Sequence, residues 1–372
     1  MTGEAARVCL VSQREISRQA AWCSNYEFED VIASVDNADV IPLRARWAYP
    51  LRVDLLKRLI FRRVSRKLVH VNAGLEVLRI EKDYEMFVFV CMTPQDLLCL
   101  SAIKGWRERC KVKICYMTEI WANWIDKYDY QLALLKDFDH VFVCFSDSVN
   151  ALSHFLGKPC HHVPLGVDTL RFSPYPNPPA RSIDVYSIGR RIPAVHDNFL
   201  KMAARREIFY IHDTIPADFV QPANPQHHRD LVGNIAKRSR FFVTYPALIG
   251  SEETHGQSEV GARFFEGAAA GTAMIGQAPT NPVFKRDFDW PDAVIPMPTN
   301  EDDCRAVLGR FTREPERLKA LSRKNATEAL RRFDWSYRWK EILRIAGIEP
   351  RPQHQQREKG LQQLAAMADS QP

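Results

Sequence analysis

The chain has 372 residues, of which 46% are hydrophobic and 26% are charged, and its formal net charge is +6. This length allows two domains of ordinary size with a core each, and no apolar run is long enough to span a bilayer. The nine cysteines stand singly without a C-x-x-C pair, which supports neither a zinc site nor a disulfide framework. The first residues read as a strand and not as a signal peptide, so we expect a cytoplasmic location.

The first half of the chain alternates between strand and helix patterns. We expect strands at residues 7–12, 38–43, 85–91, 111–117 and 139–144, and helices at residues 20–34, 96–106 and 146–156. Within the strand expected at residues 85–91, the residues after Glu85 are continuously apolar, as in a central strand of a parallel sheet with both faces covered. The alternation predicts a doubly wound α/β sheet.

A basic amphipathic segment interrupts this alternation. Residues 44–67 contain nine Lys or Arg and one acid, Asp54, and leucines recur at helical spacing from Leu51. We predict a helix over residues 51–68 that contacts an anionic membrane surface or an acidic acceptor. A core helix with a solvated basic face is the alternative. Nucleic acid is not expected as a partner, because no stacking aromatics are interleaved and no nucleic-acid motif occurs.

Glu119 follows the strand expected at residues 111–117, two positions before Trp121. Open α/β sheets place their ligands at this carboxyl edge. Glu119 is therefore a candidate general base. The alternatives are a carboxylate at the edge of a cleft that contacts the acceptor, or a solvated side chain.

The proline-rich residues 174–179 are the clearest linker, and a second α/β pattern follows them. We expect strands at residues 183–188, 208–211, 240–244, 272–275 and 293–296, and helices at residues 229–239, 302–310, 314–333 and 337–346. The glutamine-rich tail from residue 351 has no lasting period, so we expect it to be mobile.

Residues 255–276 have the order of a phosphate-binding loop, a helix and a buried strand. Gly261 allows the backbone to approach a ligand, and Ser258 can cap the helix, whose first amides then form an anion site. Glu266 lies five residues past Gly261, about 7.5 Å along a helix, which is roughly the span from a diphosphate to a ribose. A nucleotide could therefore be held at both ends. An ordinary helix of an α/β sheet is the alternative.

Four segments together resemble group 1 glycosyltransferases. They are VPLGVDTLRFSP at residues 163–174, SIGRR at 187–191, RFFEG at 263–267 and FDWSYRW at 333–339. The chain is most similar to the divergent branch that includes the spore-maturation-type glycosyltransferases. The resemblance implies an α/β chain of the GT-B fold, in which two Rossmann-like doubly wound domains face each other across a cleft.

The resemblance also implies a division of the chain. An N-terminal acceptor-side domain would cover residues 1–173, and a nucleotide-sugar-binding domain would cover residues 174–335. Residues 336–349 would form a terminal helix that returns toward the first domain, and residues 350–372 would be a disordered tail.

The implied activity is a retaining transfer of a sugar from a nucleotide diphosphate donor to a hydroxyl acceptor on a glycan, a lipid-linked molecule or a small molecule. Neither a metal nor a cofactor is expected beside the donor. A nucleotide-sugar epimerase or hydrolase on the same fold is one alternative, and a non-catalytic sugar-nucleotide binding partner is another. The sequence contains no indication of an oligomeric state.

Residue by residue, the resemblance assigns Glu266 to the ribose hydroxyls, and cations to the charge that grows on the leaving diphosphate. The expected donor-binding residues are Gly189, Arg190, Arg191, Tyr245, Ser258, Gly261, Arg263 and Glu266. The first glutamate of the paired-glutamate motif would stand at Ser258, and Glu259 is displaced from it by one position. Glu259 is therefore the second candidate catalytic residue, beside Glu119.

Overall fold

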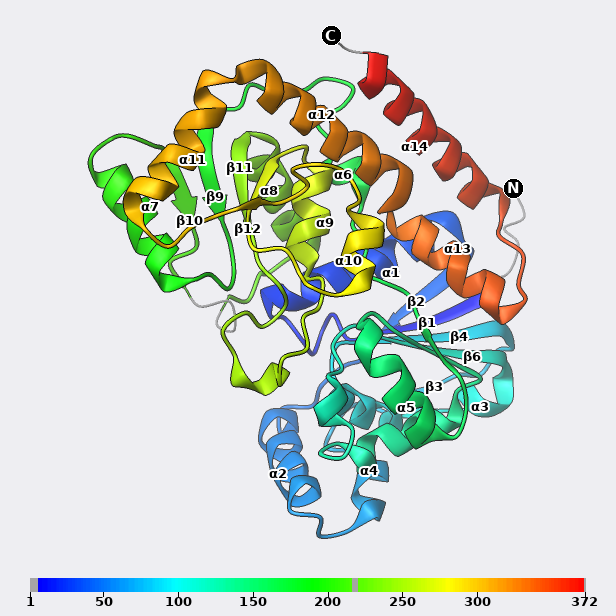
Figure 1. Cartoon of the computed structure of the whole chain (residues 1–372). Coiled ribbons are helices and arrows are strands. Elements are labelled where there is room, and N and C mark those ends of the chain that lie inside the picture. The colour runs from blue at the N-terminus through cyan, green and yellow to red at the C-terminus, as the bar shows by residue number, and fades with distance from the viewer. Residues whose placement is uncertain (1–5, 216–219, 371–372) are drawn as a thin grey trace. The chain divides into compact units, whose positions relative to one another are not determined.

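The computed structural model describes residues 6–215 and 220–370 (Figure 1). Packing divides the chain into two compact units. The first comprises the chain up to Arg18 together with Phe28–Pro164 and Trp339–His354, and the second comprises Gln19–Glu27, Leu165–Arg338 and the residues from Gln355. Each unit contains a parallel sheet with helices, so the expected α/β class is confirmed. The predicted domain boundaries stay predictions.

The described part of the first unit contains a six-stranded parallel sheet with the order β2-β1-β4-β6-β7-β8. Its strands are β1 Val8–Ser12, β2 Ala38–Pro42, β4 Tyr84–Cys91, β6 Cys110–Met117, β7 His140–Val143 and β8 Cys160–His162. A short parallel pair is formed by β3 Leu78–Arg79 and β5 Ile103–Lys104. The first half of the chain contributes the helices α1 Cys23–Val35, α2 Tyr49–Phe61, α3 Trp106–Arg109, α4 Asp129–Leu132 and α5 Val149–Leu156. The central strand β1 is wholly buried, and β4 nearly so, as parallel strands covered on both faces must be.

Two helix predictions in this half are wrong in extent. The helix expected at residues 96–106 is a 3-10 helix, Pro94–Ala102, whose start is fixed by Asp96, which accepts from the amide of Thr93 at 2.6 Å. The basic helix expected at residues 51–68 ends at Phe61. Its end follows from Arg63, whose φ of 54° is left-handed and cannot continue a right-handed helix.

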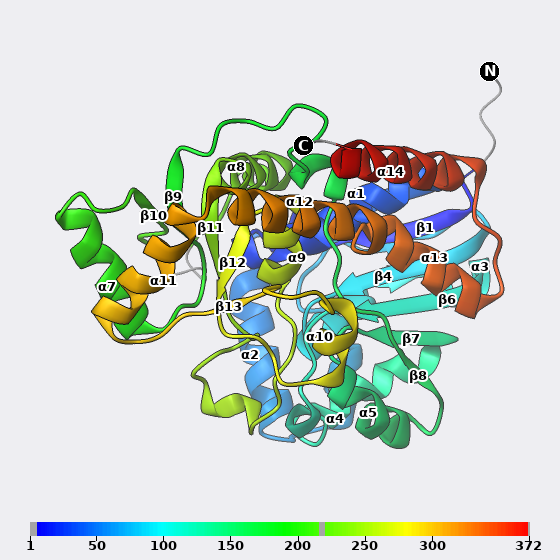
Figure 2. The same ribbon diagram turned by 45° about the horizontal axis from the view of Figure 1, so that its top comes forward.

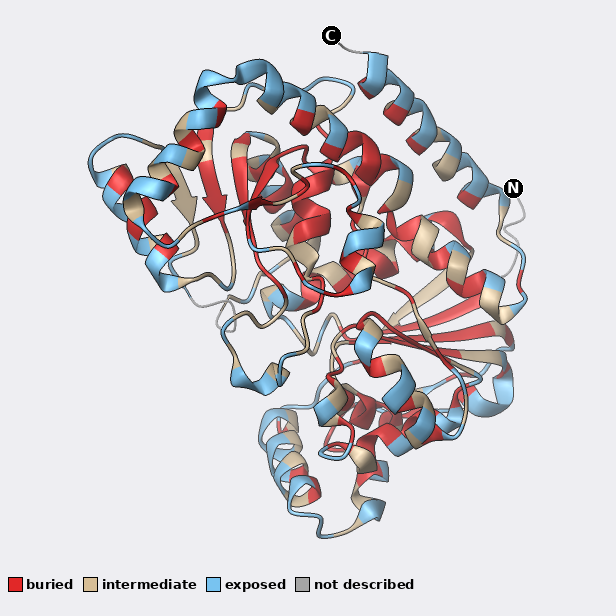
Figure 3. Cartoon of the chain, viewed as in Figure 1, coloured by how far each residue is buried: buried red, intermediate tan, exposed pale blue. Residues whose placement is uncertain are grey.

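The described part of the second unit contains a five-stranded parallel sheet with the order β10-β9-β11-β12-β13. Its strands are β9 Ile183–Ser187, β10 Tyr210–His212, β11 Ser239–Thr244, β12 Ala273–Gly276 and β13 Ile295–Pro296. The second half of the chain contributes the helices α6 Thr169–Phe172, α7 Pro193–Ala204, α8 Pro225–Lys237, α9 Ala262–Ala269, α10 Pro282–Asp287, α11 Glu301–Arg313, α12 Pro315–Arg332, α13 Trp335–Ala346 and α14 Pro352–Ser370. Turning the view leaves α9 beside β11 and β12, and most of α9 is buried (Figures 2 and 3).

The expectation of a disordered tail is wrong, because residues 352–370 form the helix α14. Glutamine and alanine are good helix formers, and the tail carries many of them. Leu361 and Ala365, one helical turn apart, are buried in a cluster with Leu330 of α12. This packing supplies the apolar contact that a solvated tail would lack.

A buried ion pair also connects α14 to residues 163–174 and 333–339, two of the four segments that resemble group 1 glycosyltransferases. Arg357 donates through Nε and Nη2 to the two oxygens of Asp334, at 2.9 and 2.8 Å, and through Nη2 to Asp168 at 2.7 Å. Burial alone would raise the pKa of Asp334, but the Arg357 guanidinium holds that pKa below its usual value. Asp334 also pairs with Val167 as an isolated parallel bridge, so segments 163–174 and 333–339 lie side by side.

Gly166 lies where these segments meet, and we predict that it tolerates no side chain. A Cβ at this position would lie 2.9 Å from a ring carbon of Trp335 and 3.0 Å from the carbonyl oxygen of Phe333. Gly166→Ala should lower the free energy of unfolding by about 1–3 kcal/mol through overpacking. Gly360→Ala is the matched control, since a Cβ there meets open space within α14. It should stabilise by about 0.5–1 kcal/mol. Denaturant unfolding measures both, and equal effects of the two changes would contradict the packing.

Candidate functional site

The second unit contains a topological switch point between β9 and β11. From β9 the chain continues to β10 on one side, whereas β11 pairs with β9 on the other side. In open parallel sheets such a point opens a crevice at the carboxyl ends of the strands, where ligands bind. Three predicted residues lie at this edge: Gly189 follows β9, Tyr245 follows β11, and Gly261 precedes α9.

The start of α9 differs in one respect from the prediction. The N-cap residue is Gly261, and no side chain caps the helix. Ser258 is not the cap, because it lies three residues upstream and its Oγ accepts from the amide of Thr280 at 3.3 Å. The expected capping role of Ser258 is therefore wrong. The first amides of α9 are left without a side-chain acceptor, which suits an anionic ligand at a helix N-terminus.

Glu266, on the second turn of α9, is the centre of a buried charge network. One carboxylate oxygen accepts from Nη1 of Arg229, and the other accepts from Nη1 of Arg263. Arg229 also donates to both oxygens of Glu27, at 2.8 and 3.2 Å. Glu27, Arg229 and Glu266 are each at most 3% exposed. These residues and Arg263 form a chain of alternating charges, which we name the charge network.

Two arginines of the charge network keep the carboxyl group of Glu266 ionised. Burial alone would raise the pKa of Glu266, but Arg263 and Arg229 lower this pKa to about 2. Burial does raise the pKa of Glu27, against the attraction of Arg229. Glu27 accepts further hydrogen bonds from the amide of Asp168 at 2.8 Å and from Nε1 of Trp335 at 3.1 Å. The charge network thus connects α8 and α9 to the segments 163–174 and 333–339.

Arg263 is the exposed end of the charge network. Its side chain is 29% exposed, against 4% for that of Arg229. Its Nε and Nη2 atoms lie 3.8 Å from the position of a Cβ on Gly189, which has a left-handed φ of 81°. Glycine at this turn therefore gives the backbone its conformation and leaves room for the guanidinium. The amide of Gly189 donates to Oδ2 of Asp213 at 2.9 Å.

The other two predicted cations differ in their surroundings. Arg191 donates to the carbonyl oxygen of Asp213 at 3.1 Å and to the carboxylate of the same residue. Arg190 is exposed and forms no ion pair with any residue that the structure describes. Arg190 and Arg263 are therefore the cations best able to meet a ligand here.

Two buried hydroxyls lie at the carboxyl end of β11. Thr244 Oγ1 and Tyr245 Oη have no hydrogen-bond partner among residues 6–215 and 220–370. Burial raises the pKa of Tyr245. A buried hydroxyl without a partner costs about 1–3 kcal/mol, and a ligand oxygen at this edge could remove that cost. Tyr245 also lies beside Gly261, because a Cβ on Gly261 would lie 3.5 Å from the carbonyl oxygen of Tyr245.

The two candidate catalytic carboxylates accept hydrogen bonds from tryptophan and amide side chains. Glu259 is 1% exposed and accepts from Nε2 of Gln257 at 2.7 Å and from Nδ2 of Asn281 at 3.2 Å. Glu119 belongs to the first unit, is half-buried and accepts from Nε1 of Trp121 at 3.1 Å. Their catalytic roles stay predictions.

Sequence reasoning did not single out Glu27 or Arg229. The pair is separated by 202 positions, so no local pattern could join them. A weak signal exists for Arg229, since Asn224 and Pro225 mark a helix start that places it in the second turn of α8. In the first unit, Glu29 was also missed. Its carboxylate is buried beside Ser12 and Arg14, and burial raises its pKa to about 7.

Metal and membrane features are scarce in the described chain. Within the described ranges, no group of three or more His, Cys, Asp or Glu side chains lies together as a metal site would require. The expectation that the reaction needs no metal stays a prediction. No helix of the described residues is both long and apolar enough to cross a membrane.

Comparisons with known proteins bear on the fold. Residues 199–344 match a family model described as "Glycosyl transferase-like". The chain is similar to an alpha-glucosyltransferase in complex with UDP and a DNA that contains an HMU base, with a TM-score of 0.57 and 10% identity over 92% of this chain and 99% of that chain. A complex of an alpha-glucosyltransferase with UDP-glucose and abasic DNA gives a TM-score of 0.53 and 11% identity, over 92% of this chain and 100% of that chain. A search of the curated proteins finds no match. The expected GT-B fold is confirmed.

Proposed function

We propose that the chain, which has the GT-B fold and matches a "Glycosyl transferase-like" family model over residues 199–344, is a glycosyltransferase that moves a sugar from a nucleoside diphosphate donor to a hydroxyl acceptor. The donor would lie at the switch point of the second unit. The observation that carries this proposal is the position of the charge network, whose exposed end, Arg263, lies beside Gly189 at the carboxyl edge of the sheet.

The proposed donor contacts follow from the residues at that edge. The uncapped amides at the start of α9, with Arg190 and Arg263, would bind the diphosphate. Glu266 would accept from the ribose hydroxyls, with Arg229 keeping its carboxylate ionised and oriented. Tyr245 offers a buried hydroxyl that lacks a partner within the described chain. Two solved structures of the same fold, each described as an alpha-glucosyltransferase, contain UDP-glucose or UDP, which makes uridine donors the first to test.

The proposed chemistry is the departure of a diphosphate from the anomeric carbon. Negative charge grows on the leaving oxygens, and fixed cations and helix amides stabilise it in the transition state without reorganisation. Arg190 and Arg263 with the amides of α9 supply such groups, so we propose a metal-independent transfer. We further propose retention of the anomeric configuration, which NMR of the product anomer would test.

Ligand-induced stabilisation provides the first test of the proposed function. UDP and UDP-glucose should raise the unfolding midpoint more than ADP-, GDP- and CMP-based donors do. A ligand bound only by the native state adds about 2.7 kcal/mol to the free energy of unfolding at a hundredfold excess over Kd. Glu266→Ala should abolish this shift. An unchanged shift in Glu266→Ala would show that the nucleotide binds elsewhere.

Donor turnover then separates the alternatives. Turnover that increases with a hydroxyl acceptor supports the transferase. Turnover that no acceptor changes would mean a hydrolase, and interconversion of the donor sugar would mean an epimerase. Tight nucleotide binding without turnover would indicate a binding partner.

We also propose that α2 and its flanks contact an anionic membrane surface. Large apolar side chains are exposed on this segment: Trp47 by 91%, Leu51 by 76%, Leu55 by 58%, Phe61 by 64% and Val64 by 63%. Leu56 and Ile60 form the buried face instead, so the exposed residues are not part of the core. Figure 3 shows most of α2 as exposed.

The charges around this apolar stripe favour a lipid surface as its occupant. Arg46, Arg52, Arg58 and Arg62 are exposed and form no ion pair within the described chain. Each basic residue near an anionic surface contributes about 1 kcal/mol, and the apolar side chains can enter the interface. Duplex DNA would meet the cations but would leave five large apolar side chains in water.

Vesicle binding tests the membrane proposal. The protein should bind phosphatidylglycerol vesicles at least about tenfold more tightly than phosphatidylcholine vesicles, and added salt should weaken the binding. Trp47→Ser combined with Leu51→Ser should lower the partition by about tenfold or more. Leu231→Ser is the matched control, because Leu231 is 57% exposed on α8. Equal binding to both vesicle types, or tighter binding to duplex DNA than to anionic vesicles, would refute the proposal.

A further inference from the structure

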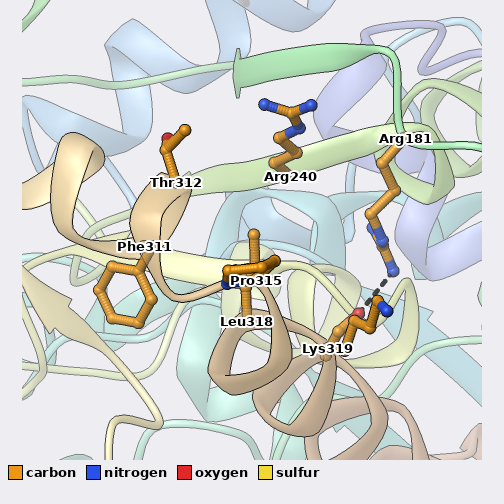
Figure 4. Close-up of a pocket in the computed structure, with 8 residues that line it drawn as sticks. Arg181, Arg240, Phe311, Thr312, Pro315, Leu318 and Lys319 are labelled. Atoms are coloured by element: carbon orange, nitrogen blue, oxygen red, sulfur yellow. Dashed lines mark hydrogen bonds between the residues drawn. The ribbon is translucent and has the colours of Figure 1, made fainter.

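A second concave site lies at the other edge of the sheet in the second unit. It is a pocket of about 370 Å³ between the sheet and the junction of α11 with α12 (Figure 4). Arg181 stands just before β9, and Arg240 is the second residue of β11, so both mark the amino ends of the strands. The switch point lies at the carboxyl ends, a strand length of roughly 15 Å away. The pocket is therefore separate from the proposed donor site.

The charged residues that line the pocket are all cations. They are Arg181, Arg240 and Lys319. Arg240 pairs with Asp184 at 3.0 Å and Lys319 pairs with Glu316 at 2.8 Å, and in each pair both side chains are at least 27% exposed. Such exposed pairs contribute little, so both cations can turn to a bound anion at small cost.

Arg181 holds a positive charge at the pocket without a carboxylate partner. Its Nη2 donates to the carbonyl oxygens of Ala270 at 3.0 Å and Gly271 at 2.7 Å, and to Oγ of Ser322 at 2.9 Å. These acceptors are neutral, and no carboxylate within the described ranges lies in ion-pair distance of Arg181. Burial lowers its pKa to about 10. The guanidinium remains charged at neutral pH, and its field is focused in the pocket.

Apolar side chains form the facing wall. Phe311 at the end of α11, and Pro315 and Leu318 at the start of α12, line the pocket. In Figure 4 Arg181 and Arg240 come from the sheet side, and the apolar residues come from the helices. One reading is that Arg181 only caps the carboxyl end of α9. That reading explains Arg181, but it leaves unexplained why Arg240 and Lys319 line the same apolar hollow.

We propose that this pocket binds a small organic anion. An apolar ring or short chain would pack on Pro315 and Leu318 above the buried Phe311, and a phosphate or carboxylate group would meet Arg240 and Lys319 near the charge of Arg181. The volume is at the small end for ligand sites, which suits a single ring with one anionic group. This inference does not depend on the proposed function, because it uses none of the residues at the switch point.

Calorimetric titration of the full chain tests the proposal, with phenyl phosphate, benzoate and inorganic phosphate as probes. Phenyl phosphate or benzoate should bind with a Kd below about 1 mM, and the tighter of the two identifies the anionic group. Inorganic phosphate should bind at least about tenfold more weakly, because it cannot bury a ring. Binding should persist with saturating UDP. Loss of binding in UDP would place the probes at the donor site and overturn the proposal.

A double variant shows which residues hold the probe. Arg240→Gln combined with Lys319→Gln should weaken binding at least about tenfold, while the unfolding midpoint shows that the fold is kept. Arg181 is left unchanged because it donates hydrogen bonds to the backbone carbonyl oxygens of Ala270 and Gly271, so its loss would disturb the fold. Arg238→Gln is the matched control: Arg238 is an exposed arginine two residues before Arg240 that does not line the pocket, and its loss should leave binding unchanged. Equal binding by the double variant and the wild type, or inorganic phosphate as tight as phenyl phosphate, would overturn the proposal.

Discussion

Arg229→Met is expected to lower the free energy of unfolding by about 3–5 kcal/mol, because it removes one partner of a buried ionic group. Arg229 donates to Glu27 and to Glu266, and all three side chains are buried. Methionine keeps much of the side-chain volume, so the loss would reflect the missing buried cation between Glu27 and Glu266 and not a cavity. The guanidinium also lies 4.7 Å from the centroid of the Phe172 ring, a contact that methionine partly retains.

The pH dependence distinguishes an electrostatic loss from a packing loss. In the wild type the pKa of Glu266 is lowered to about 2, so its stabilising contribution is complete above the unfolded pKa of about 4.3 and disappears as the pH falls through 2. In Arg229→Met the carboxyls of Glu27 and Glu266 lose their shared cation, so they should take up protons at higher pH than in the wild type. The gap between variant and wild type should therefore be largest near neutral pH and should narrow below about pH 5.

Denaturant unfolding across this pH range measures the gap, and an exposed ion pair provides the control. Arg286 pairs with Asp287 at 2.7 Å, but its side chain is 62% exposed. Arg286→Ala should therefore cost less than about 1 kcal/mol. A loss in Arg229→Met no larger than that in Arg286→Ala, or a gap that does not change with pH, would show that the network is not the source of stability.

The fold could be predicted from the sequence where local pattern and burial agree. The strand predicted at residues 85–91 is β4, Tyr84–Cys91, and its continuous apolar run after Glu85 is the part that is buried, as a parallel strand covered on both faces requires. The helix α7 was missed although its signal is present. Pro193 stands in its first turn, and Val195, Phe199 and Met202 form its buried stripe.

The tail and the basic helix show where local pattern is insufficient. The stripe of α14 is short, and Leu361 is buried because α12 offers Leu330 as a partner. In α2 the leucine spacing did predict a helix, but it could not say which leucines face the core. Leu51 and Leu56 belong to the same pattern, yet Leu51 is 76% exposed and Leu56 only 5%.

The candidate site could be predicted in part, because its local and distant components differ in kind. Gly189 shows its role in the sequence, since glycine suits a left-handed turn after a strand. The position of Glu266 on the helix could be predicted from its spacing of five residues from Gly261. Its partners could not be found this way, because Glu27 and Arg229 reach it through tertiary packing alone. Ser258 is the opposite case. It was predicted as a helix cap from its residue type, but its hydroxyl accepts from the amide of Thr280 instead.

Arg263→Ala is expected to weaken UDP binding by about 10- to 100-fold while changing the free energy of unfolding by less than about 1 kcal/mol. The charge network gives the reason for this separation. Arg263 is its exposed end and lies beside Gly189, where the proposed diphosphate would bind. Glu266 keeps Arg229 as a buried partner when Arg263 is lost, so no charge is stranded. Arg229→Met should destabilise strongly for the opposite reason.

Calorimetry with UDP, together with denaturant unfolding of the same samples, measures both effects. Arg263→Lys keeps the charge but loses the planar fork, so it should recover only part of the affinity. Arg286→Ala should bind UDP as the wild type does, since its side chain pairs on the surface with Asp287. If Arg263→Ala bound UDP with unchanged affinity, the assignment of this cation to the diphosphate would be wrong. If it unfolded as readily as Arg229→Met, Arg263 would be a structural member of the network, and the diphosphate would depend on Arg190 and the amides of α9.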